Sequence, residues 1–314
     1  MKSYTEEALS AGTKKTYNQG VKAYRKFQSY INEDQSNAPH PDHDRIVLFI
    51  AYLAYNKKLS YRCVRTYVYS VRNWVLQNGG PDPTKPRSHR KRHQLEQLLA
   101  GVKRANRAKR NVKKALKLRE VTKLVRRLNI TNVMNHTCKI MFKAALLLAF
   151  FGFLRCSEYT RTSLNRGFCL RRKDVKVNND HIKVTLRKTK SNQFSSSIVR
   201  IYGNGTEICP LSAMNEYLNS RNLKKSSPLF WKGSSPLTYS SFNAILKQLL
   251  TAVGLNPSQY SSHSLRSGAA TTAANRGIPS WLIQNLGRWH SDCYKIYVKN
   301  PVNAIRKAQL SMSK

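Results

Sequence analysis

The sequence predicts a mainly helical protein of two domains, with a small antiparallel β-sheet in the second domain. Its 314 residues are enough for two separate hydrophobic cores. Apolar side chains recur at the three- and four-residue spacing of helices through most of the chain. Three short segments with the composition of strands follow one another between residues 174 and 202. Together these observations predict the fold class.

Four helical patterns make up the first domain. They cover residues 14–30, 44–55, 61–77 and 93–105. Asp44 and Ser60 have side chains that cap helix N-termini, so we place them at the starts of the second and third helices. The turn-forming residues 78–83 and the basic run 85–93 predict a loop before the last helix, facing either nucleic acid or solvent.

A segment rich in Lys and Arg, residues 101–117, separates the two domains, and we place the boundary near Arg110. The domains then span residues 1–110 and 111–314. Helical patterns in the second domain cover residues 119–128, 137–154, 210–219, 239–253, 263–275 and 279–286. The expected strands are residues 174–177, 181–186 and 197–202.

The charge of the chain indicates a polyanionic partner. Lys and Arg number 56 against 15 Asp and Glu, and the formal net charge of +41 exceeds what solubility requires. The most apolar stretch, residues 141–154, is too short to span a bilayer and contains Lys143, so it predicts a buried helix. We therefore expect no membrane partner, and composition alone indicates a nucleic-acid-binding protein, an RNA-binding protein included.

The N-terminus and the cysteines bear on the compartment and on metal binding. No apolar run follows Lys2, Glu6 and Glu7, so we expect no secretory signal and a protein of the nucleus, if eukaryotic, or otherwise of the cytoplasm. The six cysteines lie far apart and form no Cys-x-x-Cys pair. We therefore expect reduced thiols, no metal site and no cofactor.

Two arginines in the second domain have a charged or titratable neighbour at helical spacing. Arg155 follows an apolar stretch and stands three residues before Glu158, and Arg266 stands three residues after His263. Arginine donates two parallel hydrogen bonds to a phosphate, and a charge at the edge of a buried helix needs a partner such as Glu158. Taken alone, each arginine is more typical of a surface or DNA-backbone contact, and His263 of a helix-start residue bonded to backbone.

Further candidates follow along the chain. Lys190 lies in the turn after the second strand and has a flexible amine that suits proton donation to a leaving oxygen, with Lys188 two residues earlier as the alternative. Trp289 is either a core aromatic or an N–H donor to phosphate. Tyr294 and Tyr297 are either core aromatics or nucleophiles, because a phenolate near cations attacks phosphorus.

In order and context these residues resemble the tyrosine recombinase, or integrase, family over roughly residues 118–301. Leu154-Arg-Cys-Ser-Glu-Tyr resembles the first-arginine motif and His263-Ser-Leu-Arg266 the His-x-x-Arg box. Leu286-Gly-Arg-Trp-His-Ser-Asp, followed by Tyr297 eight residues after Trp289, resembles the nucleophile region. The Gly-Arg-Trp sequence and the segment Lys188-Thr-Lys-Ser-Asn-Gln look closest to Crypton-like recombinases of eukaryotic mobile elements.

The resemblance implies a two-domain clamp on double-stranded DNA, with a helical core-binding (SAM-like) domain and a recombinase catalytic domain. It implies cleavage and rejoining through a 3′-phosphotyrosyl intermediate without metal or ATP, in a homotetramer that pairs two DNA sites. The implied catalytic residues are Arg155, Lys190, His263, Arg266, Trp289 and Tyr297, with Glu158 in support and Lys188, His290 and Tyr294 as alternatives. It also implies that the tail, residues 302–314, docks on a neighbouring protomer, the alternative being a short helix that folds back onto its own domain.

Three other classes compete with an active recombinase. A catalytically silent DNA-binding protein of the same fold shares every structural expectation. A type IB topoisomerase shares much of the chemistry but pairs no DNA sites. A basic RNA-binding protein shares only the charge.

Overall fold

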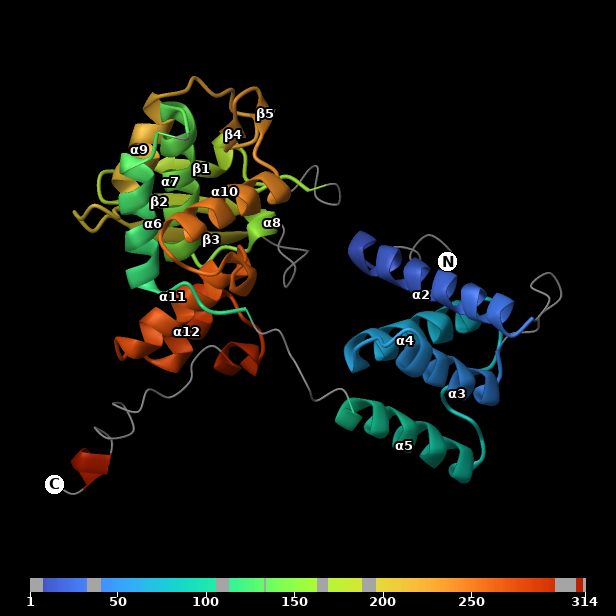
Figure 1. The fold of residues 1–314 in the computed structure, drawn as a ribbon. Coiled ribbons are helices and arrows are strands. Elements are labelled where there is room, and N and C mark those ends of the chain that lie inside the picture. The colour runs from blue at the N-terminus through green and yellow to red at the C-terminus, as the bar shows by residue number, and fades with distance from the viewer. Residues whose placement is uncertain are drawn as a thin grey trace. The chain divides into compact units, whose positions relative to one another are not determined.

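The computed structural model describes residues 8–32, 41–105, 113–132, 134–162, 169–187, 196–296 and 309–312. The chain forms two compact units, residues 1–110 and 111–314. Each unit has its own hydrophobic core. In Figure 1 the first unit is coloured from blue to teal and the second from green to red.

The first unit is helical. It contains α2 (Ala11–Tyr30), α3 (His43–Ala51), a π-helical turn (Tyr52–Asn56), α4 (Tyr61–Gln77) and α5 (His89–Ala105). Helix α2 packs closely on α4 at Gly20, where an added Cβ would lie 2.4 Å from the Cβ of Ser70. The rings of Tyr24, Phe27 and Phe49 fill the core beside this contact.

Two details of the first unit differ from the sequence prediction. Asp42, and not Asp44, caps α3, since its side chain accepts a hydrogen bond from the Arg45 amide at 2.9 Å. Helix α5 begins at His89, so the basic run 85–93 is a loop only in its first part. The prediction for Ser60 is confirmed, because its hydroxyl accepts from the Cys63 amide at the start of α4.

The second unit wraps its helices around a buried α7. Its helices are α6 (Leu118–Ile130), α7 (His136–Phe151), α8 (Cys156–Tyr159), α9 (Pro210–Asn219), α10 (Tyr239–Ala252), α11 (His263–Asn275) and α12 (Ser280–Gly287). Short 3₁₀ turns cover Arg172–Asp174, Pro257–Gln259 and Asp292–Ile296. Most side chains of α7 are buried, as expected of an apolar segment too short for a membrane.

The predicted antiparallel sheet is present, in the order β1 (Val175–Val177), β2 (His181–Leu186) and β3 (Ser197–Tyr202). Every second side chain of β2 is buried, which places one face of the sheet on the core. A second, two-stranded sheet of β4 (Trp231–Lys232) and β5 (Ser235–Pro236) was not predicted from sequence. The predicted fold class, mainly helical with a small antiparallel sheet, is confirmed.

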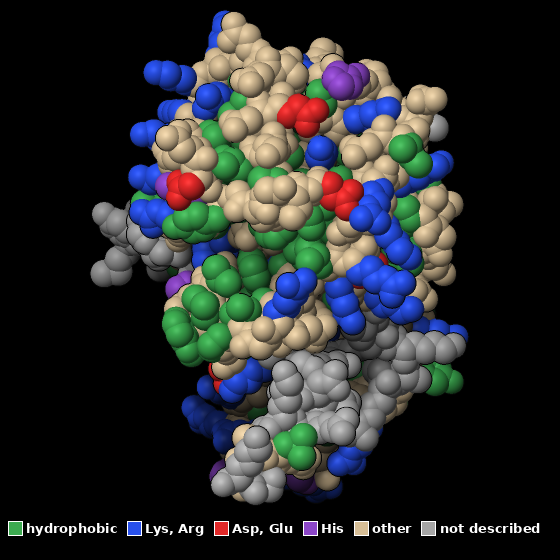
Figure 2. Space-filling model, turned by 90° about the vertical axis from the view of Figure 1, so that its left-hand side faces the viewer, with side chains coloured by type: hydrophobic (Ala, Val, Ile, Leu, Met, Phe, Trp, Pro, Cys, Tyr) green, Lys and Arg blue, Asp and Glu red, His purple; other side chains and the backbone are tan. Residues whose placement is uncertain are grey.

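The surface reflects the composition. On the face shown in Figure 2, Lys and Arg side chains are spread widely and Asp and Glu are few. In the part of the chain that the structure describes, no helix is long and apolar enough to cross a membrane. Within the same part, no cluster of His, Cys, Asp and Glu has the arrangement of a metal site. Cys63, Cys138, Cys156, Cys169 and Cys209 are free thiols.

Candidate active site

The candidate site begins at the turn that ends α7. This turn is a Schellman motif, in which the Leu154 amide donates to the Ala149 carbonyl and the Phe153 amide to that of Phe150. The motif requires a left-handed residue after the helix, and here that residue is Phe153 with φ of 50°. Glycine normally avoids the cost of this conformation, so the backbone at Phe153 is strained.

Arg155 follows this turn and forms a pair with Glu158. The three-residue spacing had predicted that Arg155 and Glu158 share one helix face. Instead, the Arg155 backbone is extended and Arg155 is the N-cap of α8. The Glu158 carboxylate accepts from the Arg155 amide at 2.9 Å and from its guanidinium at 3.0 Å. Glu158 is 5% exposed, whereas part of the Arg155 side chain reaches the surface. The predicted Arg155–Glu158 pairing is therefore present, with different local geometry.

Arg266 lies on the buried face of α11 and is only 1% exposed. Its two terminal nitrogens donate to the carbonyl oxygens of Phe153 and Gly287. Its guanidinium carbon also lies 4.5 Å from the ring centroid of Trp289, in cation–π contact. Arg266 thereby joins the turn after α7 to the end of α12.

The end of α12 repeats the geometry of the first turn. The Trp289 amide donates to the Gln284 carbonyl and the Arg288 amide to that of Asn285, which again forms a Schellman motif. The left-handed residue is Arg288, with φ of 54° and ψ of 46°. A Cβ on Gly287 would lie 1.7 Å from the Trp289 ring, so glycine permits this packing.

Arg288 connects the two turns, and the sequence analysis assigned it no role. Its guanidinium donates to the Gly152 carbonyl at 3.1 Å, to the Phe153 carbonyl at 3.2 Å and to Glu158 Oε2 at 3.0 Å. Glu158 is therefore shared by two arginines, Arg155 and Arg288. The sequence feature that could have revealed Arg288 is an arginine at the end of a predicted helix, where glycine is usual.

His263 begins α11 and is exposed. Protein atoms packed beside its ring and then the positive charges of Arg266 and Arg155 lower its pKa. The ring is accordingly neutral at neutral pH and has the form that accepts a proton. His263 therefore lies within electrostatic range of both candidate arginines, and it precedes Arg266 by three residues on α11.

The aromatic candidates differ in their surroundings. Trp289 is half-buried and its ring meets Phe153 edge-on, with centroids 6.3 Å apart. Tyr294 is 4% exposed and packs on Trp289, with centroids 6.1 Å apart, so it has the position of a core aromatic. His290 is exposed on the turn after α12.

Three candidates lie outside the described residues. Lys188 and Lys190 belong to the connection between β2 and β3, of which residues 188–195 are not described. Tyr297 follows directly on the described 3₁₀ turn Asp292–Ile296. The structure thus gives no side-chain geometry for the proposed acid and nucleophile.

The assembled residues form a cationic cluster with one carboxylate. Hydrogen bonds and one cation–π contact link Arg155, Glu158, Arg288, Arg266 and Trp289 in one chain of interactions, through the carbonyl of Phe153. Three guanidinium groups and one carboxylate leave a positive balance before His263 is counted. Such a balance suits an anion on which negative charge develops, as at a phosphodiester under attack.

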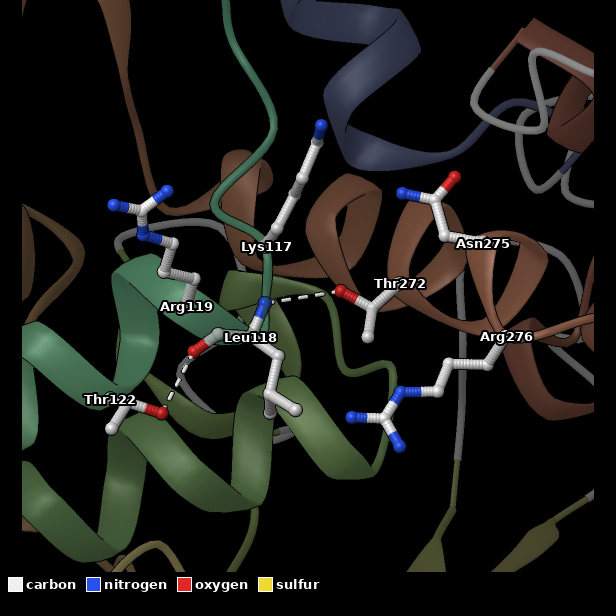
Figure 3. A pocket seen from close by; sticks show the side chains of 7 residues that line it. All are labelled: Lys117, Leu118, Arg119, Thr122, Thr272, Asn275 and Arg276. Atoms are coloured by element: carbon white, nitrogen blue, oxygen red, sulfur yellow. Dashed lines mark hydrogen bonds between the residues drawn. The ribbon is translucent and has the colours of Figure 1, made fainter. Parts of the chain in front are cut away.

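A cavity of about 380 Å³ elsewhere on the second unit is also basic. It lies between the start of α6 and the end of α11, where the Leu118 amide donates to the Thr272 hydroxyl at 3.1 Å (Figure 3). Lys117, Arg119 and Arg276 line it, and in Figure 3 their charged ends point in different directions. In a chain with a net charge of +41, three such cations do not by themselves mark a binding site.

Comparison with known proteins shows the family and the fold. The phage integrase family matches residues 114–301. No curated protein sequence matches the chain. Among solved structures, the XerH site-specific recombinase bound to a palindromic difH substrate is 15% identical, with a TM-score of 0.68 over 96% of this chain and 80% of that one.

Two further structures share the fold. The Tn1549 transposon integrase in complex with transposon right-end DNA is 15% identical, with a TM-score of 0.64 over 98% of this chain and 95% of that one. A lambda integrase dimer bound to a core site is 14% identical, with a TM-score of 0.59 over 95% and 75% of the two chains. The family match covers more than half of the chain, and so this protein belongs to the phage integrase family.

Proposed function

We propose that this protein is a site-specific DNA recombinase that cleaves and rejoins DNA strands through a 3′-phosphotyrosyl intermediate. The observation that carries the proposal is the cationic cluster in which Arg155 and Arg288 share Glu158, and in which Arg266, stacked on Trp289, bonds to the same Phe153 carbonyl as Arg288. The cluster lies within the residues that match the phage integrase family.

Each residue has a distinct part in the proposed reaction. The Tyr297 oxygen bonds to phosphorus while the bond from phosphorus to the 5′ oxygen breaks. Neutral His263 accepts the phenol proton, and Lys190 gives a proton to the departing 5′ oxygen. Arg155 and Arg266 stabilise the charge that builds on the non-bridging oxygens, with Trp289 as a further N–H donor. Rejoining reverses these steps and needs no ATP.

The proposed partner is double-stranded DNA, held by both units of the chain. The formal charge of +41 supports this, because phosphate neutralisation dominates the affinity of proteins for DNA. We also propose that two DNA sites are paired by four protomers, that the tail 302–314 packs on a neighbouring protomer, and that the gene belongs to a mobile element. In a eukaryotic host the protein would then act in the nucleus.

A covalent capture experiment tests the proposal without a known target sequence. The full chain is incubated with a pool of duplexes that have randomised centres and a nick that lets the released strand diffuse away. After denaturation, DNA that remains joined to protein is isolated and sequenced. We expect capture of a defined sequence by the wild-type chain and none by Tyr297→Phe, with equal non-covalent binding by both.

Other outcomes distinguish the competing functions. Strong binding of one sequence without any covalent capture would overturn the proposal in favour of a silent DNA-binding protein. Capture at sequences without preference, together with relaxation of supercoiled plasmid, would favour a topoisomerase. Loss of DNA binding in Tyr297→Phe would show that the variant tests folding and not chemistry, so its thermal unfolding is measured alongside.

A further inference from the structure

We infer that Arg288 is a positioning residue, which fixes the segment carrying Trp289 against the Arg155–Glu158 pair. This inference rests on the proposed function. It is carried by the two left-handed helix ends that meet at the site and by the three groups that the Arg288 guanidinium joins.

At this helix end, as at the end of α7, a residue other than glycine takes the left-handed position. Helices α4, α10 and α11 end in the same hydrogen-bonded motif, and each places glycine at the left-handed position, at Gly79, Gly254 and Gly277. Helix α12 places Arg288 there instead. A left-handed arginine costs free energy that glycine would avoid, so the side chain must supply something that the backbone turn does not require.

The Arg288 side chain extends toward the turn after α7. There the guanidinium reaches the Gly152 and Phe153 carbonyls, and the Phe153 carbonyl also accepts from Arg266. Phe153 is itself left-handed, so two strained turns are joined at one oxygen atom.

The third acceptor ties Arg288 to the proposed chemistry. Glu158 Oε2 accepts from Arg288, while Oε1 accepts from Arg155. The carboxylate therefore aligns one arginine that reaches the surface with another that is 11% exposed and belongs to the Trp289 segment. Movement of that segment would pull on Glu158 and so on Arg155.

The burial of Arg288 has a cost in folding stability. Within the described residues, its buried Nε–H has no hydrogen-bond partner. Burial lowers the pKa of the guanidinium and Glu158 opposes that change. A buried cation with an unpaired donor is costly, which fits a residue kept for the geometry of the site.

The decisive variant is Arg288→Gly, because glycine adopts the left-handed backbone without strain while the whole side chain, guanidinium included, is removed. The matched control is Lys58→Gly, which replaces another left-handed cation, with φ of 48°, at an exposed position of the first unit. Arg288→Lys keeps the charge but cannot reach three acceptors at once.

Two readouts are compared in the full chain. In the first, hydrogen exchange of the amides of residues 289–296 should accelerate in Arg288→Gly and not in Lys58→Gly. In the second, the rate of covalent capture at saturating DNA should fall about 100-fold in Arg288→Gly, the scale of a misplaced catalytic group. The DNA affinity of Arg288→Gly should match that of Lys58→Gly. Arg288→Lys should have exchange and capture rates between those of the wild type and Arg288→Gly.

Opposite results would overturn the inference. Wild-type exchange and capture rates in Arg288→Gly would show that the guanidinium positions nothing. A loss that appears only as weaker DNA affinity would make Arg288 a DNA contact instead.

If the wild-type chain captures no DNA, the proposed function fails, while hydrogen exchange still decides whether Arg288 fixes the segment. If Arg288→Gly does not fold, Arg288→Lys decides by the same measurements, and wild-type behaviour of that variant overturns the inference.

Discussion

Arg155 and Arg266 hold their guanidinium groups in different surroundings. Arg155 reaches the surface and donates to a carboxylate, whereas Arg266 is enclosed and donates to two backbone carbonyls. A guanidinium that bridges the Phe153 and Gly287 carbonyls has a two-donor geometry that a lysine cannot reproduce.

We predict that Arg155→Lys and Arg266→Lys each slow covalent capture by about 10²- to 10³-fold, the usual effect of removing one donor to transition-state charge. Arg266→Lys should also lower the unfolding temperature, since one ammonium cannot span the Phe153 and Gly287 carbonyls. Capture kinetics and thermal unfolding are measured on both variants. Full activity of either one would remove that arginine from the site.

His263 gives the protein a pH-dependent stability whose sign is fixed by its lowered pKa. In the unfolded chain its pKa returns to about 6.5, so below that pH the unfolded state binds a proton that the folded state resists. The contribution of His263 to the free energy of unfolding is therefore full at neutral pH and is lost as the pH falls.

This sign predicts a comparison between wild type and His263→Asn. Urea unfolding at about pH 7.5 and at about pH 5.5 should show that acidification destabilises the wild type more than the variant. The variant is the control for all other titrating groups. Parallel losses in the two proteins would contradict the lowered pKa.

Helix α11 carries both His263 and Arg266, and its placement depends on the segment before α6. The Leu116 amide donates to the Ser264 carbonyl, and the Leu118 amide to the Thr272 hydroxyl. Between these two contacts, a Cβ on Gly268 would lie 1.6 Å from the Leu116 carbonyl oxygen. Gly268 therefore allows the close approach that seats the helix.

We predict that Gly268→Ala destabilises the second unit by about 1–3 kcal/mol or more, because rigid backbone must move. The control is Gly101→Ala in α5, where a Cβ would meet nothing within 4 Å. That change should stabilise the first unit by about 0.5–1 kcal/mol. Chemical denaturation followed in each unit measures both effects, and a neutral Gly268→Ala would show that α11 has room to shift.

The sequence predicted elements better than the connections between them. Helices Tyr61–Gln77, Pro210–Asn219 and His263–Asn275 and strands His181–Leu186 and Ser197–Tyr202 begin and end at the predicted residues. Helix α7 ends at Phe151, three residues before the predicted end, since Phe153 adopts a left-handed conformation that periodicity does not reveal. Strands β4 and β5, of two residues each, are too short for any alternating pattern.

The same limit explains what was missed at the site. The pairing of Arg155 with Glu158 followed from their proximity in sequence and from the scarcity of acidic residues. Arg288 depends on a backbone angle and on carbonyls more than 130 residues away in the chain. Neither feature is visible in a local sequence pattern, and so a role was predicted for the adjacent Trp289 and none for Arg288.

At the scale of the whole molecule, the charge predicts a steep salt dependence of DNA binding. If both units contact phosphates, the slope of log affinity against log salt should be about −0.9 for each phosphate neutralised, summed over both units. Residues 1–110 and 111–314, expressed separately, should each give a shallower slope than the full chain. A single unit with the slope of the full chain would contradict binding by both.

The identity of the nucleophile tests the central claim most directly. Protein that has captured DNA is digested with protease and nuclease, and the peptide that retains nucleotide is sequenced by mass spectrometry. We expect the nucleotide to be joined to Tyr297. Attachment to Tyr294, which packs against Trp289 in the core, or to any other residue would show that Tyr297 is not the nucleophile.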